Sequence, residues 1–337
     1  MTLREMARAS LMSQGIAVPS GGAMLMIGAA FAPAAASGGM HSTSDFTQIL
    51  ADIAHKSMLR GFNEAPESFQ KFTSVGHMGD LKPHSRVGLG SFPSLTKVEE
   101  GGEFKYGTVG EHGETAVLAT YGRLFAITRQ GIINDDLNML SKIPSNMGRA
   151  ARRTVAQLVY AVLNSSPLMS DGKTLFHADH KNLADTGGIP SEATINAGIT
   201  AMATQTDRQD SEVKLNIPPK YLLANPTQRS AVLQALNSEH APDDTSKAGS
   251  AKQPRAYNTV RDAAEPIFDA RVTGNAWYLA ADPNVYDTIE VGYLDGVDTP
   301  WLDQQDGWSV DGTEFKVRID ACATALAFEG LYKNPGQ

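Results

Sequence analysis

Three side chains that can bind a metal ion or move a proton lie within four residues: His177, Asp179 and His180. Imidazole and carboxylate groups suit zinc and other divalent ions. A catalytic zinc site holds three protein ligands and an open position, and the spacing of the other histidines identifies no further ligand. The segment follows Pro167 and a turn at 171–172, so it is predicted to be a loop. We therefore weigh a metal-dependent enzyme against hydrogen bonds that pin this loop, and favour the second.

Other catalytic patterns fit the chain less well. It has no Gly-x-Ser-x-Gly elbow and no phosphate loop ending in Gly-Lys-Ser or Gly-Lys-Thr. The acidic pair Asp135 and Asp136 is explained by helix capping, and Asp243 and Asp244 by a solvated loop. Cys322 lies in an apolar run, which predicts a buried, inert thiol. We predict no enzyme and no cofactor.

Composition indicates an ordinary globular chain. Of 337 residues, 42% are apolar and 20% charged, enough for a sizeable core. The formal net charge is −8, and the basic residues form only small groups such as Arg149, Arg152 and Arg153. A dedicated nucleic-acid binder shows a basic patch or stripe, so this class is disfavoured. A wall that merely encloses nucleic acid needs no such patch.

The N-terminal region superficially resembles a signal peptide, because Arg4 and Arg8 precede an apolar run at 23–36. The run contains Gly28 and Pro33 and is separated from the basic part by further glycines. It is shorter than the ~20 residues that span a bilayer. We therefore expect no membrane anchor, and a secreted binding module stays an alternative. Residues 1–45 are rich in small residues and are predicted to form an extended arm.

The middle of the chain predicts a helix and then a long β-hairpin. Residues 45–60 place Phe46, Ile49 and Ile53 at helical spacing, with Gly61 as the end. Residues 82–128 are predicted to form an extended hairpin, with arms at 85–95 and 115–128 and glutamates near its turn. An isolated two-stranded hairpin is marginal in water. A hairpin as long as the one predicted at 82–128 is expected to pack against another subunit.

A long helix follows and then a mixed α/β domain. Residues 134–136 are expected to cap a short helix that Pro144 interrupts, and the main helix is predicted at 145–164. Its apolar stripe is predicted to face away from its arginines, Arg152 included. Helices are then expected at 191–205 and 226–238, strands at 221–224, 267–272 and 276–280, a loop at 239–259 and a closing strand at 315–328. Core packing is favoured for Trp277, Trp301 and Trp308, and an interface is the alternative for Trp301 and Trp308, which flank a polar segment.

This order of parts is similar to that of a known family. The residues that carry the resemblance are Tyr-Gly-Arg-Leu-Phe-Ala-Ile-Thr-Arg-Gln at 121–130, Ile-Asn-Asp-Asp-Leu at 133–137, Met-Gly-Arg-Ala-Ala at 147–151, Phe-His-Ala-Asp-His at 176–180, and segments 317–320 and 332–335. The chain resembles the major capsid proteins of tailed phages with the α+β Hong Kong 97 fold, and in particular the major head subunit of Mu-like phages. The likeness covers about residues 1–335.

The resemblance implies an N-terminal arm with short helices at 1–81 and an extended hairpin loop at 82–128. It implies a peripheral domain, made of the spine helix and terminal strands, at 129–166 and 311–337. An axial domain, which surrounds the centres of capsomers, would occupy 167–310. The chain carries no protease region, so a maturation protease would be a separate or already removed part, and cross-linking is not carried over.

The function implied is structural. Many copies would assemble, in the host cytoplasm, into hexamers and pentamers of an icosahedral virion shell that encloses double-stranded DNA. Other implied partners are portal, scaffold, protease and decoration proteins, with no membrane. The candidate contact residues between subunits are Phe46, Ile49, Ile53, Glu99, Glu103, Lys105, Tyr106, Glu111, Arg123, Arg129, Arg149, Arg153, Trp301 and Trp308.

Overall fold

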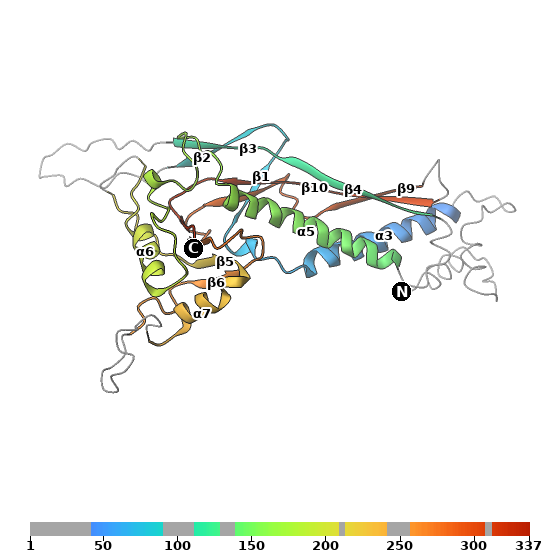
Figure 1. The fold of residues 1–337 in the computed structure, drawn as a ribbon. Helices are drawn as coiled ribbons and strands as arrows, with labels where there is room; N and C mark the ends of the chain where they lie inside the picture. The colour runs from blue at the N-terminus through green and yellow to red at the C-terminus, as the bar shows by residue number, and fades with distance from the viewer. Residues whose placement is uncertain (1–41, 90–110, 129–138, 209–212, 241–256, 307–311) are drawn as a thin grey trace, which may run out of the picture. The chain divides into compact units, whose positions relative to one another are not determined.

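A computed structural model describes residues 42–89, 111–128, 139–208, 213–240, 257–306 and 312–337 (Figure 1). The chain divides into two compact units. Unit 1 comprises Met1–Pro66, Ala119–Thr154 and Val297–Asp320, and unit 2 comprises Glu67–Leu118, Val155–Gly296 and Ala321–Gln337. The division into arm, hairpin, peripheral and axial parts stays a prediction. Within the described ranges, no helix is both long and apolar enough to span a bilayer.

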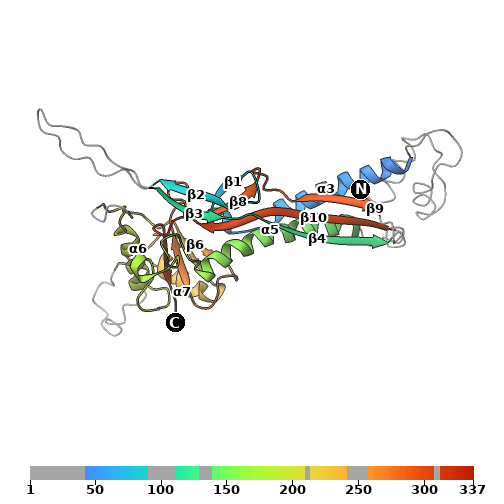
Figure 2. The same ribbon diagram turned by 90° about the horizontal axis from the view of Figure 1, so that it is seen from above.

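Unit 1 contains a sheet whose central strand is the first part of β10 (Gly312–Ala325). The strand β9 (Trp301–Asp306) pairs with it antiparallel, from Arg318 opposite Trp301 to Thr313 opposite Asp306. The strand β4 (Ala119–Thr128) lies on its other side, as Figure 2 also shows. Side chains alternate along β10, so that Phe315, Val317 and Ile319 are buried while the residues between them are exposed.

Two helices of unit 1 cross at very short range. They are α3 (Ser42–Glu64) and the first part of α5 (Met139–Ser165). A Cβ atom on Gly148 would lie 2.1 Å from the carbonyl oxygen of Met58, and one on Gly61 would lie 2.1 Å from that of Ser145. The expectation that Gly61 ends the first helix was wrong. This glycine lies inside α3 because only a residue without a side chain allows the two backbones to approach so closely.

The helix α5 is continuous, so the predicted interruption at Pro144 was wrong. Proline near the start of a helix removes one hydrogen bond, and the turn before it can remain helical. The capping residues 134–136 lie outside the described ranges. Arg152 was expected on the exposed face but is buried, with its guanidinium 4.6 Å from the centre of the Phe62 ring. A cation over an aromatic face can be buried in this way.

Unit 2 contains a four-stranded sheet in the order β11 (Leu331–Asn334), β7 (Trp277–Ala280), β5 (Tyr221–Ala224) and β6 (Glu265–Phe268). Its core includes α6 (Glu192–Ala203), α7 (Arg229–Asn237) and the fully buried Trp277. The strand predicted at 221–224 is confirmed, as are the helix at 191–205, to within two residues at its end, and the core position of Trp277. The helix predicted from residue 226 begins instead with a 3-10 turn, Pro226–Gln228, and α7 follows.

A second group of strands in unit 2 joins segments far apart in sequence. The strand β8 (Ile289–Leu294) pairs in parallel with β1 (Ser74–Met78) and antiparallel with residues 321–325 of β10. Cys322 is buried there, and burial raises the pKa of its thiol, as expected for an inert cysteine. Sequence analysis missed β8, β1 and β9.

The hairpin was only partly anticipated. The strand β2 (His84–Leu89) pairs antiparallel with β3 (Glu111–Ala116), from His84 opposite Ala116 to Leu89 opposite Glu111. The prediction of one return strand at 115–128 was wrong, because β3 ends at Ala116 and β4 begins at Ala119. Leu118 between them is buried against Met78 and Cys322, and the two strands have different partners, since β3 pairs with β2 and β4 with β10. Residues 90–110 lie outside the described ranges.

Candidate assembly site

The histidine loop of unit 2 is a compact turn closed by backbone hydrogen bonds. The amide of Met169 donates to the carbonyl of Lys173 and the amide of Leu175 to that of Pro167, both at 2.8 Å. Gly172 has a φ of +78°, which a side chain would oppose. The loop therefore has a defined conformation of its own.

His180 is the buried centre of this loop. Its Nε2 lies 2.6 Å from Oδ2 of Asp171, and its Nδ1 lies 3.2 Å from the carbonyl oxygen of Leu175. The ring stacks on Phe328 with centroids 3.9 Å apart and planes 3° from parallel. Burial opposes the ionised form of Asp171, yet the hydrogen bonds from His180 and from the Lys173 amide lower the pKa of this carboxyl.

The other two residues of the predicted cluster make separate contacts. His177 accepts a hydrogen bond from the amide of Asp179 at its Nδ1, 3.2 Å away, and so caps the short 3-10 helix Ala178–His180. The hydrogen bond from Lys173 to Asp179, 2.7 Å long, lowers the pKa of that carboxyl. Among the described residues, no three His, Cys, Asp or Glu side chains are grouped as metal ligands. The loop geometry supports the hydrogen-bonding interpretation over the metal site.

Within unit 2, the base of the hairpin is attached through Glu114 of β3 to the turn that contains Ser170. This carboxylate is buried, and the amide of Ser170 donates to both of its oxygens at 3.1 Å. The Ser170 hydroxyl donates to it at 2.7 Å. A buried carboxylate is tolerated only when such donors replace its water.

Directly opposite Glu114 in the hairpin register is Arg86 of β2. Its guanidinium donates to the carbonyl of His77 at 2.9 Å and forms an ion pair with Glu290 of β8. A Cβ atom on Gly76 would overlap the Glu290 carboxylate, so this glycine makes the room for the pair. Burial raises the pKa of Glu290, and Arg86 opposes that rise. Two opposed residues of the hairpin thus anchor both of its strands.

The exposed face of the unit 1 sheet presents an aromatic side chain among charges. Trp301 is 44% exposed, and the Arg318 guanidinium lies 4.5 Å from the centre of its indole ring. The Lys316 ammonium lies 5.5 Å from the ring and 3.5 Å from Asp303. Leu124 of β4 is 71% exposed. Tryptophan and arginine are enriched at the centres of protein interfaces.

The predicted contact residues fall into three groups. Arg123, Arg149, Arg153 and Trp301 are exposed, and Ile53 is half-buried. Arg149 lies 3.9 Å from Glu64 of α3. Phe46, Ile49 and Glu111 have a described backbone but no described side chain. The remaining ones, Glu99, Glu103, Lys105, Tyr106, Arg129 and Trp308, lie outside the described ranges.

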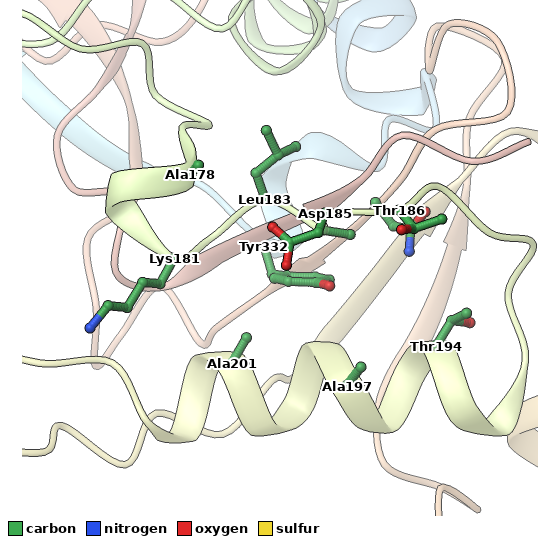
Figure 3. Close-up of a pocket in the computed structure, with 11 residues that line it drawn as sticks. Ala178, Lys181, Leu183, Asp185, Thr186, Thr194, Ala197, Ala201 and Tyr332 are labelled. Carbon is green, nitrogen blue, oxygen red and sulfur yellow. The ribbon is translucent and has the colours of Figure 1, made fainter.

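Unit 2 also contains an open cavity of about 480 Å³ beside α6 (Figure 3). Thr194, Ala197 and Ala201 of α6 line one side, and Tyr332 of β11 lies opposite with Asp185 next to it. Burial raises the pKa of Tyr332, and Asp185 adds to the rise. The Lys181 side chain extends away from Asp185 in Figure 3. These groups do not converge on one point, so the cavity is not an evident ligand site.

Sequence analysis missed the anchors Arg86, Glu114, Ser170 and Glu290. The first two lie in the predicted hairpin. They face each other only in the observed register of β2 and β3, which the prediction of a single return strand at 115–128 did not include. No local signal marks Ser170 or Glu290, because each becomes important only through residues that are distant in sequence.

The fold is similar to those of solved phage proteins at low sequence identity. "Microbacterium phage Oxtober96" aligns with a TM-score of 0.53 and 12% identity, over 81% of this chain and 92% of that one. "Capsid structure of the Cyanophage P-SCSP1u" aligns with a TM-score of 0.51 and 11% identity, over 80% and 88%. "Mycobacterium phage Adephagia" gives 0.50 and 14%, over 83% and 90%. No curated protein matches the chain at a significant level.

These alignments and the described elements show the α+β Hong Kong 97 fold, which confirms the predicted fold class. A family model described as "Phage capsid protein" matches residues 113–334, well over half of the sequence. The chain belongs to this phage capsid protein family. It is therefore a structural component of the virion and not an enzyme.

Proposed function

We propose that this chain is the major head subunit of a Mu-like phage, and that many copies form the icosahedral shell. Membership of the capsid family is the observation that carries the proposal. The Mu-like assignment is supported by the segments at 121–130, 147–151 and 176–180. One of these segments now has a physical role, since Gly148 allows the close crossing of α3 and α5.

The described hairpin supports assembly through shared surface. Its strands β2 and β3 pair with each other as a two-stranded sheet, and such a sheet is marginal in water without further support. Its base is fixed by the Arg86 and Glu114 anchors. In our proposal residues 90–110 and the N-terminal arm lie on neighbouring copies, as the resemblance implies.

Other partners follow from the role of a shell. The packaged double-stranded DNA would be enclosed without sequence-specific contacts, in keeping with the net charge of −8. Portal, scaffold, maturation protease and decoration proteins are the other partners that we propose for the shell. The metal-dependent enzyme is not retained as a second function, because the geometry of the histidine loop gives it no support.

Electron microscopy of the purified full-length chain in negative stain tests the proposal. We expect pentamers, hexamers or closed shells, because the subunit would gain more buried surface than a standard interface of ~1,600 Å² provides. A monodisperse monomer that persists across salt and crowding conditions would count against it.

The exposed face around Trp301 gives a separate prediction. We expect Trp301→Ala to reduce shell yield at least tenfold, because truncation of a hot-spot tryptophan costs about 2 kcal/mol or more. The unassembled chain should lose only about 1 kcal/mol of stability, because the half-buried ring gives up its contacts with Arg318 and Lys316. The readouts are sedimentation yield and circular dichroism, with Leu81→Ala, an exposed leucine in unit 2, as the control. Equal shell yields for Trp301→Ala and Leu81→Ala would show that Trp301 does not lie at an interface between subunits.

A further inference from the structure

The helical layer of unit 1 has a basic face. The helix α3 and the first part of α5 lie along one face of the sheet formed by β9, β10 and β4, and α3 contacts β9 (Figure 1). The buried side of this layer includes Ala54, Met58 and Phe62 of α3 and Ala151 of α5. Its solvent side carries five exposed basic side chains: Lys56, Arg60, Lys142, Arg149 and Arg153.

The basic side chains of the two helices meet on one surface. Along α5, Lys142, Arg149 and Arg153 are separated by seven and four residues, which places them within about 40° of one another around the helix axis. Glu64 of α3 joins this row to the second helix. Its carboxylate pairs with Arg60 at 2.6 Å and lies 3.9 Å from the guanidinium of Arg149.

This surface is positively charged in a chain whose formal net charge is −8. Among the described side chains of the two helices in unit 1, two exposed acidic ones, Asp52 and Glu64, stand against the five exposed basic ones. The described strands of unit 1 are balanced instead, because three basic side chains stand against three acidic ones: Arg123, Lys316 and Arg318 against Asp303, Glu314 and Asp320. The excess of positive charge therefore lies on the helical layer.

We propose that this basic helical face binds the phosphates of duplex DNA, and that it lines the inside of the shell. The inference rests on the proposed function, because a closed shell brings one face of its wall against the packaged DNA. It adds the face of unit 1 and the residues that meet this DNA. Contacts to phosphates carry no sequence information, so they agree with the enclosure of DNA of any sequence.

The charge density of the partner favours duplex DNA over an acidic protein segment. The row on α5 spans about 16 Å at ~1.5 Å per residue. Over that length duplex DNA has one negative charge per ~1.7 Å, whereas an extended acidic chain has one per ~3.4 Å. Within the described part of unit 1, ion pairs on this face involve Glu64 alone. Lys56, Lys142 and Arg153 can therefore bind phosphate without losing an ion pair to a described residue.

Fluorescence anisotropy with a short labelled DNA duplex and the unassembled full-length chain tests this binding at several salt concentrations. The test variant combines three exposed substitutions on α5: Lys142→Gln, Arg149→Gln and Arg153→Gln. The matched control removes the same charge from exposed lysines of unit 2: Lys82→Gln, Lys181→Gln and Lys214→Gln. Circular dichroism checks that each variant is folded.

We expect the dependence of log affinity on log salt to become shallower by about 2–3 in the test variant, since each phosphate contact contributes ~0.9 to the slope. The control should keep the slope within about 0.5 of the unaltered chain. The charge-conserving pair Arg149→Lys with Arg153→Lys should also keep it. An unchanged slope in the test variant, or an equal loss in the control, would overturn the proposal.

Competition with polyglutamate distinguishes the two kinds of polyanion. Its lower charge density should make it displace the duplex at least about tenfold less effectively, per charge, than unlabelled DNA. Equal competition would identify an acidic protein segment as the partner and would overturn the assignment to DNA.

Closed shells test which side of the wall is basic. Shells of the unaltered chain should not bind duplex DNA that is added outside, because the basic face is enclosed. Closed shells that bind this DNA with the slope of the unassembled chain would overturn the inner position. A chain that never assembles contradicts the proposed function, whereas shells built from a chain without salt-dependent DNA binding contradict this inference alone.

Discussion

Replacement of Gly148 by alanine should destabilise unit 1 by about 2 kcal/mol. The new Cβ would lie 2.1 Å from the carbonyl oxygen of Met58 and 2.9 Å from the amide nitrogen of Phe62, both of them backbone atoms of α3. Alanine favours a helix over glycine by about 1 kcal/mol, but overpacking costs about 1–3 kcal/mol and more when backbone must move. The steric cost therefore exceeds the propensity gain, and α3 must separate from α5.

Urea denaturation of the unassembled chain measures this effect. The matched control is Gly79→Ala, because a Cβ there has no heavy atom within 4 Å, so a change within about 0.5 kcal/mol is expected. Gly148→Ala should also lower the yield of shells, since unit 1 carries the exposed face around Trp301. A Gly148→Ala protein as stable as the control would show that the two helices do not cross at this distance.

Replacement of Arg86 by methionine should cost about 3–5 kcal/mol at neutral pH, the usual penalty for leaving a buried charge without its partner. Glu290 is 7% exposed, and burial already raises its pKa even with Arg86 present. Without the guanidinium, the folded state binds a proton at Glu290 more tightly than the unfolded state, whose carboxyl titrates near ~4.3. Stability of the variant must then fall as the pH rises above that value.

Thermal unfolding across pH distinguishes this cause from a simple packing loss. The deficit of Arg86→Met should be small near pH 4, where Glu290 is protonated, and full at pH 7, in line with the ordinary glutamate pKa of ~4.3. The double variant Arg86→Met with Glu290→Gln should recover about half of the loss or more, because no buried charge remains. A deficit that is independent of pH, with no recovery in the double variant, would contradict the anchor.

The sequence predicted those parts of the fold that local patterns determine. The strand at 221–224 is a short apolar run, the helix at 191–205 has its cap at Ser191, and Trp277 is in the core; each was predicted correctly. Gly61 and Pro144 were misjudged for the same reason. Glycine and proline commonly end helices, and both residues were predicted to do so from their type alone. The close packing of α3 on α5 instead requires a glycine inside α3, and α5 continues through its proline.

The candidate site was harder to predict because its contacts depend on register and on distant segments. The residues 115–128 have one uniform β pattern, yet they are divided between β3, which pairs with β2, and β4, which pairs with β10. The opposition of Arg86 and Glu114 depends on the β2–β3 register, and their partners Glu290 and Ser170 are distant in sequence. His180 was correctly expected to pin a loop, but the acceptor at each ring nitrogen was not visible in the sequence.

A cryo-electron microscopy reconstruction of the assembled full-length protein tests the central claim most directly. We predict a closed icosahedral shell in which the hairpin of each copy, held at its base by Arg86 and Glu114, contacts a neighbouring copy. A particle in which every hairpin folds back on its own subunit, or a chain that never assembles, would contradict it.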